Sequence, residues 1–349
     1  MREITIGNHR VADDTDTYVI AEIGHNHEGS LDKAVALFRQ AAAAGAQAVK
    51  LQKRDNQNLF VRSMFDQPYE GRNSYGPTYG RHREALEFGH DEFSVLVDVA
   101  EDLGIDFFST AFDIASVDFL MKYDLPAIKI ASADLTNTPL LEHAATTQKP
   151  LIVSTGGADM DDVRRAVDTV LSISSQLVLL QCTAVYPAAP SDLNLAVIET
   201  YRQEFPNTVV GFSGHDLGPE ASWIAHALGA RVVEKHFTLD QYRPGSDHHY
   251  SLDPVGLQQL TRGLSRTREA IGVPEKVCAE NEAAAIRKMG KKLVAARRLP
   301  AGTALTAADV AVKSPGDGLK PYQLQQVVGR TLTVDLEEDA DIRLDVLQP

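Results

Sequence analysis

The chain has 349 residues, of which 44% are hydrophobic and 23% are charged, as in ordinary globular proteins. Its formal net charge of −14 argues against a nucleic-acid partner or an anionic membrane surface, because no polybasic stretch offsets it. Two cysteines are too few for a disulfide framework. No segment reads as a signal peptide or as an apolar span of about 18 residues, so we expect a cytoplasmic protein without a membrane partner.

Short β-branched runs alternate with Ala- and Leu-rich amphipathic segments along most of the chain, which predicts strands and helices in turn. The predicted strands are residues 18–24, 46–52, 105–110, 127–131, 150–154, 177–183, 208–213 and 231–236. The predicted helices are residues 31–44, 91–103, 114–122, 138–146, 159–170, 193–203, 219–228 and 254–271. Eight such pairs predict an α/β fold, a closed (β/α)8 TIM barrel of about 250 residues. A doubly wound open sheet is the alternative, but the turn at residues 24–29 is not a Gly-rich nucleotide loop.

The pattern changes after residue 271, where short strands and turns replace the alternation. We divide the chain into a catalytic barrel of residues 1–280, a linker of residues 281–290 and a small domain of residues 291–349. About 60 residues form an independent domain only marginally, so this domain is expected to lean on a barrel, its own or a partner's.

Two histidines stand at the ends of the last two predicted strands. His215 follows Val-Val-Gly-Phe-Ser-Gly, and His236 follows Ala-Arg-Val-Val-Glu-Lys. Because the carboxyl ends of barrel strands meet at one mouth, the two imidazoles are expected at a spacing that suits a divalent metal. A single histidine at a rim is more often a hydrogen-bonded polar residue, but two on adjacent strand ends favour a metal site.

Groups that bind anions and move protons stand at the ends of other strands. Lys50 and Lys129 end strands two and four, where a buried ammonium without an anion is costly. Hydroxyl donors at successive strand ends are Thr110, Ser132, Ser154 and Ser213. One such serine alone is more often a turn residue, so the whole set carries the argument. Glu22 and Glu234 end strands one and eight, which meet where the barrel closes, and carboxylates there accept hydrogen bonds from sugar hydroxyls or transfer protons.

Seven motifs in order resemble those of the sialic acid synthase family. They are IAEIGHNHEG from Ile20, AVKLQK ending at Lys53, IKIASAD ending at Asp134, STGG from Ser154, QCT from Gln181 with Tyr186-Pro187, GFSGHD ending at Asp216, and EKHFTLD ending at Asp240. The tail, from Ala295-Arg-Arg through Pro315-Gly-Asp-Gly to Val328-Gly-Arg, resembles the antifreeze-like (SAF, β-clip-type) domain of that family.

The resemblance implies condensation of phosphoenolpyruvate with the open-chain aldehyde of N-acetylmannosamine or its 6-phosphate, with release of phosphate by C–O cleavage. It implies a divalent metal, Mn²⁺ first and Mg²⁺ or Co²⁺ as alternatives, and a domain-swapped homodimer. The implied phosphoenolpyruvate contacts are Lys129, Ser132, Ser154 and Ser213, with Lys50 and Gln52 beside them. Glu22 is implied against the sugar, Glu234 near the reacting carbons, Asp247 near the acceptor hydroxyls and Tyr186 in the substrate site.

Two departures from the bacterial pattern leave the acceptor open. Ala184 stands where many relatives carry Asn, and Ser314 stands where an Arg often precedes Pro-Gly. The insertion at residues 68–83 instead resembles the animal-type synthases that act on the sugar 6-phosphate. Its region holds Arg54, Arg72, Arg81 and Arg83, and guanidinium forks suit a phosphate. We therefore assign Arg72 and Arg81 to the second phosphate, with a solvated basic loop as the alternative.

Other interpretations stay open at this stage. The family also contains synthases for legionaminate, pseudaminate and deaminated sialic acid. A Schiff-base aldolase could use Lys50 or Lys129 on the same barrel, and the tail alone could argue for a noncatalytic binding role. The loop histidines are expected to be solvated and are left out of the metal site; they are His25, His27, His248 and His249.

Overall fold

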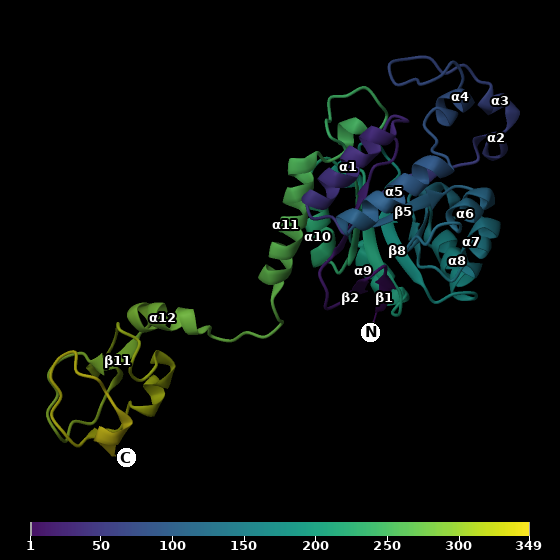
Figure 1. Cartoon of the computed structure of the whole chain (residues 1–349). Helices are drawn as coiled ribbons and strands as arrows, with labels where there is room; N and C mark the ends of the chain where they lie inside the picture. Colours follow the sequence, from purple (N-terminus) through teal and green to yellow (C-terminus); the bar gives the residue numbers. More distant parts are fainter. Residues whose placement is uncertain (1, 349) are drawn as a thin grey trace. The chain divides into compact units, whose positions relative to one another are not determined.

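Eight parallel strands close into a barrel in the order β10-β3-β4-β5-β6-β7-β8-β9, so the predicted fold class is confirmed (Figure 1). The computed structural model describes residues 2–348. The barrel strands are β3 (Tyr18–Glu22), β4 (Ala48–Lys53), β5 (Asp106–Ala111), β6 (Ile128–Ile130), β7 (Leu151–Ser154), β8 (Leu177–Cys182), β9 (Val209–Gly214) and β10 (Val232–His236). Every residue of β3 and of β7 to β10 is buried, because helices cover the outer face of a parallel barrel while side chains fill its interior.

The helices that follow the strands surround the barrel (Figure 1). They are α1 (Leu31–Ala43), α5 (His90–Leu103), α6 (Ile114–Leu120), α7 (Thr138–Thr146), α8 (Met160–Leu171), α9 (Val197–Glu204), α10 (Glu220–Ala227) and α11 (Pro254–Ile271). Polar side chains fix several of their starts. Ser30 accepts a hydrogen bond from the Lys33 amide, and Asp159 accepts from two amides in the first turn of α8, which satisfies donors that a helix start leaves free. All eight predicted helices are present, with α9 beginning four residues later than predicted.

An N-terminal hairpin, which is not among the predicted elements, lies at one end of the barrel (Figure 1). It joins β1 (Glu3–Ile6) and β2 (His9–Ala12) in antiparallel register. Ile4, Ile6 and Val11 are buried within the main hydrophobic core. The hairpin is therefore part of the barrel unit and covers apolar surface at the end away from the insertion.

The insertion between β4 and α5 folds into three short helices at the other end of the barrel, the end that also carries the loop between β10 and α11 (Figure 1). They are α2 (Asn56–Leu59), α3 (Arg62–Phe65) and α4 (Tyr79–Glu84). Gly80 lies against the ring of Phe65 so closely that a Cβ atom would come within 2.4 Å of it. The ring of Tyr69 lies 4.6 Å from that of His82, centroid to centroid. This packing fixes α4, and with it Arg83.

The chain divides after Gly272 into two compact units, and the second begins at Val273. The second unit contains α12 (Ala283–Met289), β11 (Lys292–Ala295), β12 (Val310–Lys313), β13 (Thr331–Leu332) and β14 (Leu347–Gln348). Its own small core consists of Leu293, Ala295, Leu299, Leu305, Val327, Leu332, Leu336, Ile342, Val346 and Leu347. The predicted division into a barrel of residues 1–280, a linker of residues 281–290 and a small domain of residues 291–349 stays a prediction.

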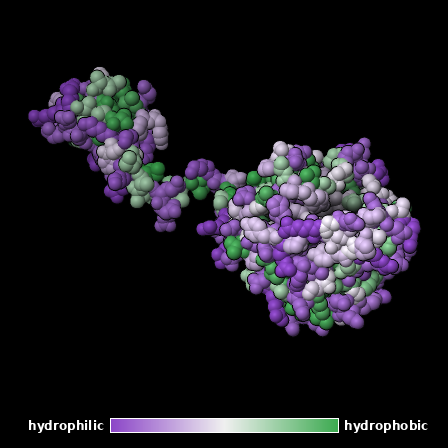
Figure 2. All heavy atoms as spheres, turned by 90° about the horizontal axis from the view of Figure 1, so that it is seen from above, coloured by the Kyte–Doolittle hydropathy of each residue, from purple (hydrophilic) through white to green (hydrophobic). Residues whose placement is uncertain are grey.

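The surface of the barrel unit seen in Figure 2 is mainly hydrophilic, with hydrophobic residues in small separate patches. Between residues 2 and 348, no helix has both the length and the apolar character that crossing a membrane requires.

Candidate active site

A cavity of about 550 Å³ lies at the carboxyl ends of the barrel strands. It is where a barrel of this type places its active site. All of the predicted site residues except Arg72 and Arg81 line it: Glu22, Lys50, Gln52, Thr110, Lys129, Ser132, Ser154, Tyr186, Ser213, His215, Glu234, His236 and Asp247. Each of the eight barrel strands, or the loop that follows it, therefore contributes a residue to the wall of this one cavity.

Strand register brings the buried charges of this cavity together. Glu22 is the register partner of Lys50, and their Oε2 and Nζ atoms lie 2.9 Å apart. The Glu234 Oε1 atom lies 3.7 Å from the Lys50 amine and 4.0 Å from the Lys129 amine. Lys50 also donates to the Thr110 hydroxyl at 2.7 Å. Two lysines and two carboxylates thus form one buried cluster in which the opposite charges stabilise each other.

The two carboxylates of the cluster differ in acidity. Burial raises the pKa of Glu22, an effect that Lys50 only partly offsets and that the nearby Glu234 increases. Burial also opposes ionisation of Glu234, but the attraction of Lys129 and Lys50 outweighs it and lowers the pKa of that carboxyl. Environments that separate the pKa values of two neighbouring acids suit them to different roles in proton transfer.

Some polar atoms of the cavity are buried without a partner. The Ser154 hydroxyl and the Glu234 Oε2 atom make no hydrogen bond within residues 2–348. A buried polar atom without a partner costs free energy. A bound substrate that accepts from Ser154 and donates to Glu234 would remove this cost.

His215 and His236 lie side by side at the rim, with 5.4 Å between ring centroids. The His215 Nδ1 atom lies 2.8 Å from the Thr183 carbonyl oxygen, which can only accept, so Nδ1 carries the proton and the Nε2 lone pair is free. Burial, together with the neighbouring positive groups, lowers the pKa of each imidazole to about 4, so both are neutral near pH 7.

Neutral imidazoles with available lone pairs fit a divalent metal. His236 Nδ1 makes no hydrogen bond among the described residues and lies 3.7 Å from a carboxylate oxygen of Asp247. No group of three or more His, Cys, Asp or Glu residues in the described chain forms a complete cation site. The two imidazoles by themselves would leave the remaining positions of a divalent metal to water or substrate oxygens.

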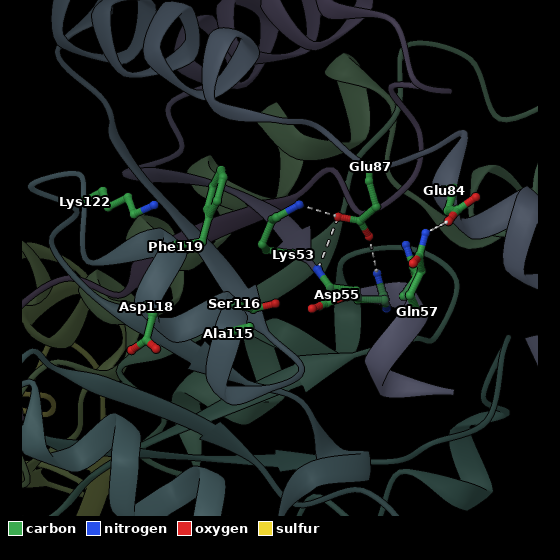
Figure 3. A pocket seen from close by; sticks show the side chains of 12 residues that line it. Lys53, Asp55, Gln57, Glu84, Glu87, Ala115, Ser116, Asp118, Phe119 and Lys122 are labelled. Atoms are coloured by element: carbon green, nitrogen blue, oxygen red, sulfur yellow. Dashed lines mark hydrogen bonds and ion pairs between the residues drawn. The ribbon is translucent and has the colours of Figure 1, made fainter. Parts of the chain in front are cut away.

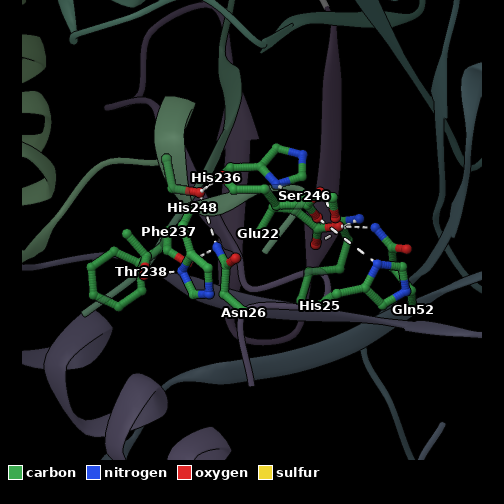
Figure 4. Close-up of polar contacts among 12 residues, drawn as sticks. Glu22, His25, Asn26, Gln52, His236, Phe237, Thr238, Ser246 and His248 are labelled. Carbon is green, nitrogen blue, oxygen red and sulfur yellow. Dashed lines mark hydrogen bonds and ion pairs between the residues drawn. The ribbon is translucent and has the colours of Figure 1, made fainter. Parts of the chain in front are cut away.

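The structure corrects the expectation that the loop histidines are solvated. His27 and His248 are buried, and His25 lines the cavity with a side chain that is 11% exposed. Figure 4 shows His25 beside Gln52 and close to Glu22. Only His249 of these four is exposed.

Arg72 and Arg81 are not brought into the cavity. Both are exposed, and Arg81 forms an ion pair with Glu84, at 2.6 Å, one turn along the same helix. Arg54 and Arg83 line the cavity instead. All four arginines lie in one basic region of the sequence, but the sequence carries no signal for the direction in which each side chain points.

A second cavity, of about 510 Å³, shares Arg54 with the first and lies against α6. Figure 3 shows Lys53 directed at Glu87 on its wall, with 3.1 Å between the amine and the carboxylate. The Arg54 amide donates to the same carboxylate at 3.2 Å. The Glu87 carboxylate therefore already binds the Lys53 ammonium and the Arg54 amide.

Known proteins match this chain along most of its length. The NeuB family model matches residues 37–276, and the SAF domain model matches residues 292–347. N-acetylneuraminate-9-phosphate synthase from Homo sapiens is 39% identical over 93% of this chain and 91% of its own. N,N'-diacetyllegionaminic acid synthase from Legionella pneumophila is 37% identical over 91% of each chain. The crystal structure of N-acetylneuraminic acid synthetase from Leptospira borgpetersenii is similar with a TM-score of 0.72 and 30% identity, covering 82% of this chain and 95% of that one. The motifs, the barrel and these matches together establish that the chain belongs to the NeuB family and carries a C-terminal SAF domain.

Proposed function

We propose that the protein is a metal-dependent sialic acid (nonulosonic acid) synthase, which condenses phosphoenolpyruvate with the open-chain aldehyde of a 2-acetamido-2-deoxyhexose. The observation that carries this proposal is the single cavity in which Lys50, Lys129, Glu22 and Glu234 meet the pair of neutral histidines. The relatives named above, synthases of sialic acid type, support the same class of reaction.

Phosphoenolpyruvate is a dense anion, and the cluster supplies the donors it needs. Lys129 is buried, donates to the Ile130 carbonyl at 3.0 Å and lies on the cavity wall. Ser132, Ser154 and Ser213 stand on neighbouring parts of that wall. Charge-assisted hydrogen bonds from an ammonium and several hydroxyls would hold the phosphate and carboxylate oxygens in a fixed orientation.

His215 and His236 are the proposed holders of the metal, Mn²⁺ first and Mg²⁺ or Co²⁺ as alternatives. When bound, such an ion polarises a carbonyl oxygen as a Lewis acid. The two imidazoles are neutral and partly free of other partners, which suits them to this role. Asp247, beside His236, is placed to accept from hydroxyls of the acceptor.

The carboxylates account for the proton transfers. Carbon 3 of the enol phosphate forms a bond to the aldehyde carbon with the electron pair of the C2–C3 double bond, which leaves negative charge on the aldehyde oxygen and positive charge at carbon 2. Water adds to carbon 2, and the proton that it gives up passes by way of a carboxylate, Glu234 being the ionised candidate, to the aldehyde oxygen. The C2–O bond to the phosphate then breaks as the C2 hydroxyl becomes the keto group, and phosphate leaves with its bridging oxygen and the hydroxyl proton.

This route predicts which bond is cut. Turnover in ¹⁸O-labelled water is expected to give phosphate without label, because the water oxygen adds to carbon 2 and all four phosphate oxygens come from phosphoenolpyruvate. Mass spectrometry of the released phosphate measures this. Label in the phosphate would indicate P–O cleavage and would contradict the route.

A Schiff-base aldolase is the less favoured candidate. Lys50 is paired with Glu22 at 2.9 Å, and an ion-paired ammonium is not nucleophilic. Borohydride in the presence of substrate would trap a covalent adduct on lysine if this mechanism operated, and we expect no adduct.

We also propose that a second copy of the chain covers the mouth, as a domain-swapped homodimer. Exposed apolar side chains follow three neighbouring strands there: Val185, Tyr186, Leu217, Leu239 and Tyr242. Tyr242 is 89% exposed. Apolar groups gathered at one rim are often covered by a partner, and a small domain with a thin core gains stability by docking.

Truncation tests the dimer. Removing residues 283–349 is expected to abolish phosphate release while the barrel keeps its circular dichroism spectrum. Mixing this truncated chain with full-length His236→Ala is expected to restore activity, since the intact barrel of one chain would meet the C-terminal domain of the other. A truncated chain that stays active, or a full-length monomer in light scattering, would contradict the proposal.

A further inference from the structure

Two arginines face one imidazole at the side of the cavity formed by the loop after β4 and by α4. The Arg54 Nη1 atom lies 3.2 Å from His25 Nε2. The Arg83 Nη1 atom lies 3.3 Å from both ring nitrogens of the same histidine. All three side chains line the cavity. Two guanidinium groups thus converge on a residue that carries no negative charge.

The positive charge of the Arg54 and Arg83 guanidinium groups is only partly balanced within residues 2–348. The Arg54 side chain is 7% exposed, and its nearest carboxylate, Glu87, lies 4.0 Å away. Glu87 is closer to Lys53, at 3.1 Å. Arg83 donates to the Tyr79 hydroxyl at 3.0 Å and forms no ion pair within residues 2–348. Arg83 is half-buried, whereas Arg54 is a buried charge whose ion-pair partner Glu87 also binds Lys53. A buried charge that is weakly paired is costly unless an anion joins it.

The centre of the cavity differs, because its charges are matched. Lys50 and Lys129 are balanced by Glu22 and Glu234. The excess positive charge therefore lies at the side, at Arg54 and Arg83. Planar guanidinium groups that present several donors are well suited to phosphate.

We propose that Arg54 and Arg83 bind the phosphate group of a phosphorylated acceptor sugar, with His25 holding the two guanidinium groups in place. This inference rests on the proposed function. The site at Arg54 and Arg83 is thus a second anion-binding position, separate from the one assigned to phosphoenolpyruvate.

The position favours the acceptor over phosphoenolpyruvate. Arg54 follows β4, whereas the proposed phosphoenolpyruvate contacts Lys129, Ser154 and Ser213 belong to β6, β7 and β9, the part of the barrel that includes β8, opposite β4. Arg54 donates to Gln52 at 2.6 Å, and Gln52 donates to Glu22 at 2.6 Å. An acceptor whose aldehyde lies near the histidines and Glu22 would extend its far end toward the arginines.

The test compares two arginines on the same helix. Arg83→Gln removes a cavity-lining charge, and Arg81→Gln removes an exposed charge that is paired with Glu84. Phosphate release from phosphoenolpyruvate is measured with N-acetylmannosamine and with its 6-phosphate. We expect the wild type to prefer the 6-phosphate, and Arg83→Gln to lower that preference by about 10- to 100-fold through a higher KM for the phosphorylated sugar. Arg81→Gln is expected to keep the wild-type preference.

Arg83→Lys and Arg54→Gln complete the set, with thermal unfolding as the check on folding. The lysine variant keeps a charge and is expected to retain part of the preference. Calorimetric titration with the sugar 6-phosphate provides a readout without turnover. A wild type that prefers the unphosphorylated sugar would overturn the inference, as would a rise in KM for phosphoenolpyruvate alone or equal effects of Arg81→Gln and Arg83→Gln. If no sugar supports phosphate release while the titration still shows Arg83-dependent binding, the proposed function fails and the anion site stands.

Discussion

Replacing His215 or His236 with alanine is expected to abolish phosphate release from phosphoenolpyruvate while the barrel stays folded. Each imidazole lies at the rim of the cavity and supplies a lone pair rather than packing to the core. Loss of one would leave a divalent ion with a single protein imidazole, which is insufficient for tight binding. Activity is measured by phosphate release, and metal content by elemental analysis of the purified variants.

His249→Ala is the matched control, because His249 is an exposed histidine of the loop after β10. It is expected to retain both metal and activity. A chelator should inactivate the wild type, and added Mn²⁺ should restore it. Chelator-insensitive turnover would defeat the assignment of the two histidines.

Lys129→Met is expected to raise the KM for phosphoenolpyruvate by about 10- to 150-fold, which corresponds to roughly 1.5 to 3 kcal/mol for a hydrogen bond to a charged group. The buried ammonium is lost from the cavity wall, and of the two lysines beside it Glu234 keeps only Lys50, at 3.7 Å. Steady-state kinetics with phosphoenolpyruvate varied at saturating acceptor measure the effect.

Lys129→Met also removes one of the two ammonium groups that stabilise the buried Glu234 carboxylate, so the variant is expected to lose thermal stability as well. Adding Glu234→Gln in the same chain should recover thermal stability without recovering activity. Lys149→Met is the control, because that lysine pairs with Asp124 on the surface. An unchanged KM for phosphoenolpyruvate in Lys129→Met would exclude this lysine from the substrate site.

The barrel was predictable because its strands leave a strong local signal. Parallel strands covered on both sides read as unbroken apolar runs, and each run is followed by an amphipathic helix. The hairpin of β1 and β2 was missed although Ile4 and Ile6 alternate with exposed residues, because four-residue strands among charged residues give a weak pattern. The helices α2 to α4 are too short for a helical period to appear.

The candidate site was predictable where strands determine position. Register alone places Glu22 beside Lys50 and Thr110 beside Lys129, so residue type at a strand end was sufficient. Loop residues depend on how the loop packs. Arg83 reaches the cavity because α4 packs through Gly80 against Phe65. Phe65 belongs to a different helix, α3, so no local sequence pattern indicates this contact. Solvated loop histidines are a reasonable average expectation, and His25 departs from it because the arginines and Asp247 enclose it.

The most direct test of the proposed synthase activity is to incubate the full-length protein with Mn²⁺, phosphoenolpyruvate and an acceptor, and to follow both products by mass spectrometry. N-acetylmannosamine and its 6-phosphate are supplied in parallel, together with acceptors of the legionaminate, pseudaminate and deaminated sialic acid type. We expect phosphate and a keto acid containing all the carbons of the acceptor plus three from phosphoenolpyruvate, in equal amounts, with at least one acceptor. Phosphate accompanied only by pyruvate and unchanged sugar, or no phosphate with any acceptor, would contradict the proposal.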